Sequence, residues 1–120
     1  LWRYDLAEWF MAAGDGTNYW EFNLAPNGAW WACAFSDTRR ANEDIPAPLA
    51  VDTKCILTDE GWCAMARIPL NELGVDVRDC KLAATFILDT PDQIFLTTAD
   101  DLSGNPDFHR PDCFCTPILK

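Results

Sequence analysis

The feature that most limits how this chain can fold is a series of short apolar runs separated by residues that reverse a strand. Residues 14–18 (GDGTN) and 26–28 (PNG) are clusters that allow the positive φ angles of tight turns. The runs around them alternate apolar and polar side chains and show no long helical period. They predict strands at residues 6–13, 18–25, 29–36, 53–58, 61–69, 81–89, 93–98 and 113–119. The chain is therefore expected to be all-β, folded as an antiparallel β-sandwich.

The connections between these runs follow from their polarity and their prolines. The first three strands succeed one another through tight turns, which favours an antiparallel meander. Residues 37–48 are polar and contain prolines, so we expect a surface loop there, and another at residues 103–112. Residues 70–74 form one expected helical turn that Gly74 ends.

Composition limits the number of domains and the class of ligand. With 120 residues, 49% hydrophobic and 23% charged, residues 1–120 are expected to form a single folded domain. No apolar run approaches the roughly 18 residues that a membrane helix needs, so we expect a soluble protein. The net charge of −10 repels phosphate backbones and anionic lipids, which argues against nucleic-acid and membrane partners. Neutral ligands or cations fit this charge better.

The six cysteines raise the question of disulfide bonds, because an even number is typical of small secreted domains. The first ten residues, LWRYDLAEWF, show neither a basic segment nor a cleavage site of a secretion signal. Cys33 and Cys63 lie in apolar strand-like runs, where a reduced cysteine behaves as a small buried hydrophobe. We therefore expect mostly free thiols and a cytoplasmic location.

Strand alternation predicts which aromatic rings face a ligand. In the second strand Trp20, Phe22 and Leu24 share one face, expected to be core, and the opposite face is polar. In the third strand the apolar alternation predicts that Trp31 packs in the core and that Trp30 faces the ligand. The candidate ligand-binding residues are Glu8, Phe10, Tyr19, Glu21, Asn23, Trp30, Arg40 and His109.

Rings stack on the C–H faces of a pyranose while carboxylates and amides bond its hydroxyls, so this set predicts a neutral saccharide as ligand. An alternative is that the same face packs under the 37–48 loop, with its acids paired to Arg39 or Arg40. Asp5 and Glu8 would point to opposite faces of a strand, which argues against paired acid/base catalysis and hence against an enzyme.

Four segments in order resemble the family 9 carbohydrate-binding modules and the related DOMON-like domains: LWRYDLAEWF, YWEFNLAPNGAWW, GWCAMARIPLNELG and PDFHRPDCF. The resemblance covers nearly the whole chain. It implies an immunoglobulin-like β-sandwich of the carbohydrate-binding-module type and a non-catalytic role in binding carbohydrate. Relatives usually have a strand before the LW motif, so the sequence also predicts an unpaired sheet edge and, through it, a homodimer.

Other ligands and roles stay open at this stage. The wider superfamily includes haem-binding redox modules, for which His109 or Met65 would be the axial ligand. Calcium could bind the aspartates at positions 100, 101 and 107, although their spacing matches no EF-hand. His109 with Cys113 and Cys115 offers three metal ligands in an unusual spacing, and we expect no metal there. An assembly domain without a small ligand is the remaining alternative.

Overall fold

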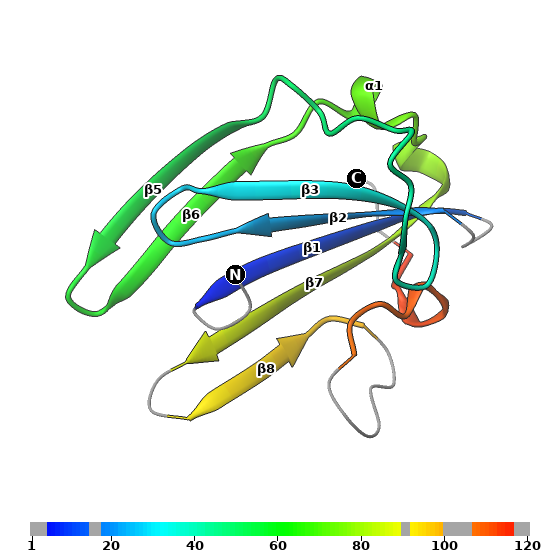
Figure 1. Cartoon of the computed structure of the whole chain (residues 1–120). Coiled ribbons are helices and arrows are strands. Elements are labelled where there is room, and N and C mark those ends of the chain that lie inside the picture. The colour runs from blue at the N-terminus through cyan, green and yellow to red at the C-terminus, as the bar shows by residue number, and fades with distance from the viewer. Residues whose placement is uncertain (1–4, 15–17, 90–91, 100–106, 117–120) are drawn as a thin grey trace.

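The computed structural model describes residues 5–14, 18–89, 92–99 and 107–116, and antiparallel strands make up most of them (Figure 1). The strands are β1 (Leu6–Ala13), β2 (Tyr19–Leu24), β3 (Trp30–Asp37), β4 (Arg40–Ala41), β5 (Asp52–Thr58), β6 (Gly61–Arg67), β7 (Cys80–Asp89) and β8 (Gln93–Thr97). One helical turn, α1 (Leu70–Leu73), and two 3-10 turns, Val77–Asp79 and Pro111–Cys113, complete the described elements. The predicted all-β class is confirmed.

The strands form two antiparallel sheets. The six-stranded sheet has the order β4-β3-β2-β1-β7-β8, and β5 pairs with β6 in a two-stranded sheet. The expected meander of the first three strands is confirmed. β1 pairs with β2 on one side and with β7 on the other, although β7 begins 67 residues after the end of β1 (80 minus 13). The result is a sandwich-like arrangement with a large and a small sheet.

Some sequence expectations for the loops are corrected. The 37–48 segment contains the short strand β4, which lengthens the edge of the large sheet beside β3. In the described part of the expected strand at residues 113–119, a 3-10 turn ends at Cys113 and one isolated bridge joins Cys115 to Leu82. Pro111 begins that turn, because its ring fixes a helical φ angle at the end of the expected 103–112 loop. The LW motif, the tip of the first turn and the aspartates at 100 and 101 lie outside the described residues.

One face of the large sheet packs against α1 and the residues that flank it. We call it the helix-side face, and its side chains are Trp9, Met11, Trp20, Phe22, Trp30, Ala32 and Ala34. Leu73 of α1 is buried against this face, and its carbonyl accepts a hydrogen bond of 3.1 Å from Trp20 Nε1. Ile68, Leu70 and Val75, which follow β6, pack against the cluster that contains the buried Ala32 and Ala34.

The opposite face, which we call the pocket face, is covered at one end by the segment 107–116. Phe114 of this segment packs against Phe10 and Tyr19, with ring centroids 5.6 and 6.2 Å apart. Phe35 of β3 stacks on Tyr19 at 4.9 Å. Hydrogen bonds between Leu82 and Cys115, 2.8 Å in both directions, hold the segment to β7. The large sheet therefore has a hydrophobic core on each of its faces.

The small sheet lies across the helix-side face and leaves a groove beside it. This groove of about 400 Å³ is lined by Trp9, Phe22 and Phe86 from the large sheet and by Ala66 and Ile68 from β6 and its end. At the other end of the small sheet, Trp62 Nε1 of β6 donates a hydrogen bond of 3.2 Å to Asp5.

Cys33, Cys55, Cys63 and Cys115 are free thiols, in agreement with the expectation that most cysteines are unbridged. Burial raises the pKa of the Cys33 thiol, and the carboxylates of Glu21 and Glu43 add to the shift. Among the described residues, no helix has both the length and the apolar character needed to cross a bilayer.

We predict that Gly28→Ala destabilises the fold more than Gly74→Ala. Both glycines have positive φ angles, 85° and 65°, so either substitution should cost roughly 1–2 kcal/mol of strain. A Cβ at Gly28 would also lie 3.0 Å from Cys55 Sγ, whereas Gly74 has open space around it. Urea unfolding of both variants measures the difference. Equal losses would show that the β2–β3 turn does not pack tightly against β5.

Candidate functional site

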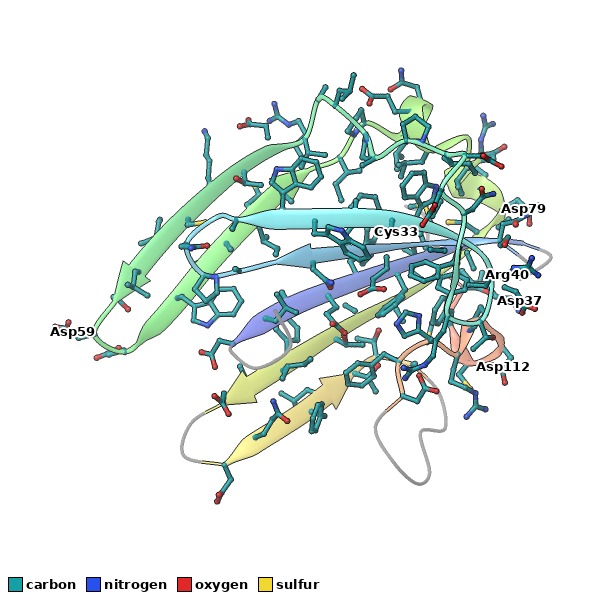
Figure 2. All side chains as sticks on the ribbon, viewed as in Figure 1. Cys33, Asp37, Arg40, Asp59, Asp79 and Asp112 are labelled. Atoms are coloured by element: carbon teal, nitrogen blue, oxygen red, sulfur yellow. The ribbon has the colours of Figure 1, made fainter. Side chains whose placement is uncertain are left out.

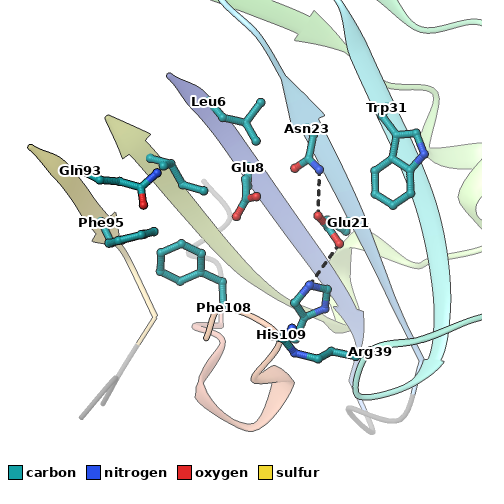
Figure 3. Close-up of a pocket in the computed structure, with 11 residues that line it drawn as sticks. Leu6, Glu8, Glu21, Asn23, Trp31, Arg39, Gln93, Phe95, Phe108 and His109 are labelled. Carbon is teal, nitrogen blue, oxygen red and sulfur yellow. Dashed lines mark hydrogen bonds and ion pairs between the residues drawn. The ribbon is translucent and has the colours of Figure 1, made fainter. Parts of the chain in front are cut away.

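The site is a pocket on the pocket face, with a cavity of about 580 Å³ (Figure 3). Its lining residues are Leu6, Glu8, Glu21, Asn23, Trp31, Arg39, Ile87, Gln93, Phe95, Phe108 and His109. They come from strands β1, β2, β3, β7 and β8, from the β3–β4 turn and from segment 107–116. The pocket thus brings together residues from most of the length of the chain.

The floor of the pocket contains a row of polar residues that crosses neighbouring strands. The register pairs Asn23 of β2 with Glu8 of β1, and Glu8 with Thr85 of β7. The Thr85 hydroxyl donates a hydrogen bond of 3.0 Å to Glu8 Oε2. Trp31 of β3 is the partner of Asn23 on its other side and continues the row to the rim. All three polar side chains are buried, so the row forms a polar strip within an otherwise apolar face.

Glu21 lies beside this row, and each of its oxygens has a polar contact. Asn23 Nδ2 donates to Oε1 over 2.9 Å, and His109 Nε2 lies 3.4 Å from Oε2. The Tyr19 oxygen accepts a bond of 3.0 Å from the Arg39 backbone N–H, which leaves its own hydrogen for His109 Nδ1 at 2.9 Å. These contacts assign the neutral-imidazole hydrogen to Nε2, which faces Glu21.

Burial dominates the electrostatics of the floor. It raises the pKa of Glu8 to about 7, with a further rise from the charge of Glu21 and a partial offset from the Thr85 hydrogen bond. Burial also raises the pKa of Glu21, against the hydrogen bond from Asn23 and the positive charge of Arg39. The pKa of His109 is lowered by burial and by Arg39. At neutral pH His109 is therefore an uncharged ring whose Nε2 lies 3.4 Å from Glu21, and the contact is not an ion pair.

The rim of the pocket carries aromatic rings on two opposite sides. Trp31 stands on the β3 side with 42% of its surface exposed. Phe95 of β8 and Phe108 form the other side, with ring centroids 6.0 Å apart. Figure 3 shows Glu8, Glu21 and Asn23 between these two walls. The arrangement can hold a flat apolar surface at the rim and polar groups at the floor.

The structure brings four of the predicted site residues together: Glu8, Glu21, Asn23 and His109. Two others lie on the same face but are inaccessible, because Phe10 and Tyr19 are buried under segment 107–116. The expected stacking role for these two rings is therefore wrong. From the 37–48 loop, the backbone N–H of Arg39 also contacts the Tyr19 oxygen.

The assignment of the adjacent tryptophans is inverted. Trp30 packs on the helix-side face, and Trp31 lines the pocket. The reason is the length of the β2–β3 loop: Ala25 and Ala29 close a three-residue turn with Gly28 at φ 85°, which pairs Trp31 with Asn23. A two-residue turn would have shifted the register by one and reversed the faces.

The expected role of Arg40 is also corrected. Arg40 is exposed on β4 and is absent from the pocket lining; Figure 2 shows it at one end of the molecule, near Asp37 and Asp112. Its neighbour Arg39 lines the pocket instead and forms an ion pair of 2.8 Å with Asp107. Arg39 lies in the β3–β4 turn with a φ angle of 56°, whereas Arg40 is the first residue of β4.

Sequence reasoning missed Phe95, Phe108 and Trp31 as pocket residues and Thr85 as the hydrogen-bond donor to Glu8. A signal existed for Thr85, which is a polar residue within the apolar run KLAATFILD. The three-residue turn with Gly28 was the signal for Trp31. For Phe95 and Phe108 no local pattern was informative, because their position depends on how β8 and segment 107–116 fold back over the sheet.

The residues considered for metal or haem do not converge. His109 faces Tyr19 and Glu21, whereas Met65 is exposed on β6 of the small sheet. Cys115 Sγ lies 2.9 Å from the carbonyl oxygen of Thr98. Within the described ranges, no group of three His, Cys, Asp or Glu side chains is arranged to hold a metal ion.

Comparison with known proteins supports the fold. No family model and no curated protein sequence matches this chain. The structure is similar to that of a protein from Bacteroides uniformis described as a "putative carbohydrate-binding protein", with a TM-score of 0.69 and 17% sequence identity. The similarity covers 95% of this chain and 60% of that protein, so this chain corresponds to less than two thirds of its length. At this identity the similarity establishes the fold.

We predict that Glu8→Gln stabilises the protein increasingly as the pH rises from 5 to 8. Because the pKa of Glu8 is raised from 4.5 to about 7, the folded state holds a proton that the unfolded state releases in this range. The wild type therefore loses up to about 3 kcal/mol from this group as the pH rises through 7, and the neutral amide avoids the loss. Urea unfolding at pH 5, 6.5 and 8 measures it.

The matched control is Glu60→Gln, which removes an exposed carboxylate from the β5–β6 turn and should follow the wild type at each pH. A constant difference between Glu8→Gln and the wild type across this range would contradict the prediction.

Proposed function

We propose that this domain binds a saccharide in the pocket, without catalysing a reaction on it. The observation that carries the proposal is the combination of aromatic walls, the exposed Trp31 and Phe95 and the half-buried Phe108, with a buried polar floor. Sugars have the same two-sided chemistry, since their rings present apolar C–H faces and their edges carry hydroxyl groups. The description of the structurally similar protein is in line with this ligand class.

The floor suits hydroxyl groups because it is rich in acceptors. The carboxyl groups of Glu8 and Glu21 and the amide oxygen of Asn23 lie at its centre, while Gln93 stands at the rim. The aromatic side chains stand on opposite sides of this floor, where each can stack on a sugar unit, and the resulting exclusion of water strengthens each polar contact. The cavity of about 580 Å³ is within the range of small-molecule sites.

We predict that Trp31→Ala abolishes saccharide binding but leaves stability nearly unchanged. Trp31 is 42% exposed at the rim, so its removal should cost less than about 1 kcal/mol of folding free energy. A glycan array identifies the bound sugar, and calorimetric titration measures the loss of affinity.

The matched control is Trp30→Ala, one position away on the helix-side face. Trp30 packs against the core around Phe22 and Ala32, so its loss should cost on the order of 3 kcal/mol. Any Trp30→Ala protein that remains folded should still bind the sugar. If Trp30→Ala removes binding in folded protein while Trp31→Ala does not, the proposed site is wrong.

We further propose that the domain self-associates through the edge of the large sheet formed by β8. Ile94 and Leu96 are 46% and 50% exposed, and the register places them beside Leu88 and Phe86 on the helix-side face. β8 ends the strand order of this sheet in the described residues, so its outer edge can accept another strand.

A homodimer is therefore expected by light scattering, and Leu96→Lys should shift it to monomer because the new charge would be buried in the contact. A monomer at every protein concentration would contradict this association without affecting the proposed sugar site.

A further inference from the structure

One buried acceptor in the pocket floor lacks a donor. Asn23 is 8% exposed, and its Oδ1 has no hydrogen-bond partner. The amide cannot be reversed favourably, because Nδ2 donates to Glu21 Oε1 at 2.9 Å and a reversed amide would set two acceptors against each other. Leaving a buried acceptor unpaired costs about 1–3 kcal/mol. Native structures contain few such groups, so this one indicates a donor supplied from outside the chain.

Two carboxyl groups stand near Asn23 Oδ1, and both are acceptors when they are ionised. Glu8 is its direct cross-strand neighbour, and Figure 3 shows the Asn23 amide and the Glu8 carboxyl facing the same space. Glu21 stands next to both and is close enough to raise the pKa of Glu8 through its charge. Thr85 cannot serve Asn23, because its hydroxyl hydrogen is directed to Glu8. Once Glu8 loses its proton, near pH 7, the floor concentrates negative charge and acceptor atoms around one position.

The protein supplies little positive charge to that position. Arg39 is the cationic side chain of the pocket lining, and its guanidinium is paired with Asp107 at 2.8 Å. His109 is neutral at physiological pH and directs its hydrogen to Glu21. A bound group that carries both hydrogen atoms to donate and a positive charge would satisfy Asn23 and compensate the carboxylates at the same time.

We propose that the saccharide bound here carries a free amino group, and that its ammonium is held between Glu8 and Asn23 Oδ1, with Glu21 adding to the negative field. This inference rests on the proposed function, because the aromatic walls must still hold the sugar ring. A hydroxyl group could donate to Asn23 but would leave the carboxylates uncompensated. An acetylated amine would likewise lack the charge.

Three β-1,4-linked disaccharides that differ at position 2 test the ligand class: the glucosamine dimer, cellobiose and N,N′-diacetylchitobiose. Calorimetric titration at pH 7 in low salt should show the glucosamine dimer binding at least about tenfold more tightly than the other two. One charge-assisted hydrogen bond contributes a difference in affinity of this size. Added salt should reduce this preference, since it screens the charge pair.

Charge-removing variants locate the ammonium. Glu8→Gln should reduce the preference for the glucosamine dimer at least about tenfold, and Glu21→Gln should reduce it less, because Glu21 acts through its charge. Both variants replace a buried carboxylate with a neutral amide, so they should fold. Thermal unfolding checks that they do. Glu43→Gln, an exposed carboxylate of the β4–β5 connection, is the control and should leave the preference unchanged.

The outcomes separate this inference from the proposed function. Equal or tighter binding of cellobiose or of the acetylated dimer would overturn the ammonium site and leave a saccharide pocket, with the neutral sugar expected from the sequence as its ligand. A preference for the glucosamine dimer that survives Glu8→Gln would also overturn it. If none of the three sugars binds and a glycan array is blank, both proposals fail.

Discussion

The pairing of β1 with β7 is the interaction on which the rest of this structure depends. β1 is a central strand of the large sheet, and it hydrogen-bonds to β2 through a local connection and to β7 across most of the chain. Only this second pairing sets Thr85 beside Glu8 and carries β8, with Phe95, to the far wall of the pocket. It also provides Leu82, to which segment 107–116 is bound. Without it the pocket would have neither its full floor nor its second wall.

The pocket floor lowers the folding stability, and the burial of the surrounding hydrophobic core offsets this loss. Two carboxyl groups, Glu8 and Glu21, are buried close enough to repel each other, and the Asn23 oxygen has no donor. The same face carries the aromatic cluster of Phe10, Tyr19 and Phe35 under Phe114, whose burial supplies stability a few residues away. Local frustration of this kind is typical of functional sites, where residues are placed for a ligand rather than for the fold.

The adjacent tryptophans show how one residue of register decides function. Trp30 and Trp31 are chemically identical and differ only in which face of β3 they occupy. Apolar alternation could not distinguish them, because both faces of the large sheet are covered and both therefore contain buried apolar side chains. The three-residue turn with Gly28 in a positive-φ conformation decides the register, and it directs Trp31 to the pocket. A turn signal was thus more informative than hydrophobicity.

The sequence by itself determined most of the strands, their meander at the start of the chain, the helical turn before Gly74, and the shared polar face of Glu8, Glu21 and Asn23, because these depend on local turns and a period of two. The tertiary structure alone decided that Phe10 and Tyr19 are buried and that His109 reaches Glu21 across 88 positions (109 minus 21). It also decided that Thr85 completes the floor. These contacts arise from long-range pairing and from coverage of a second sheet face, which no local pattern encodes.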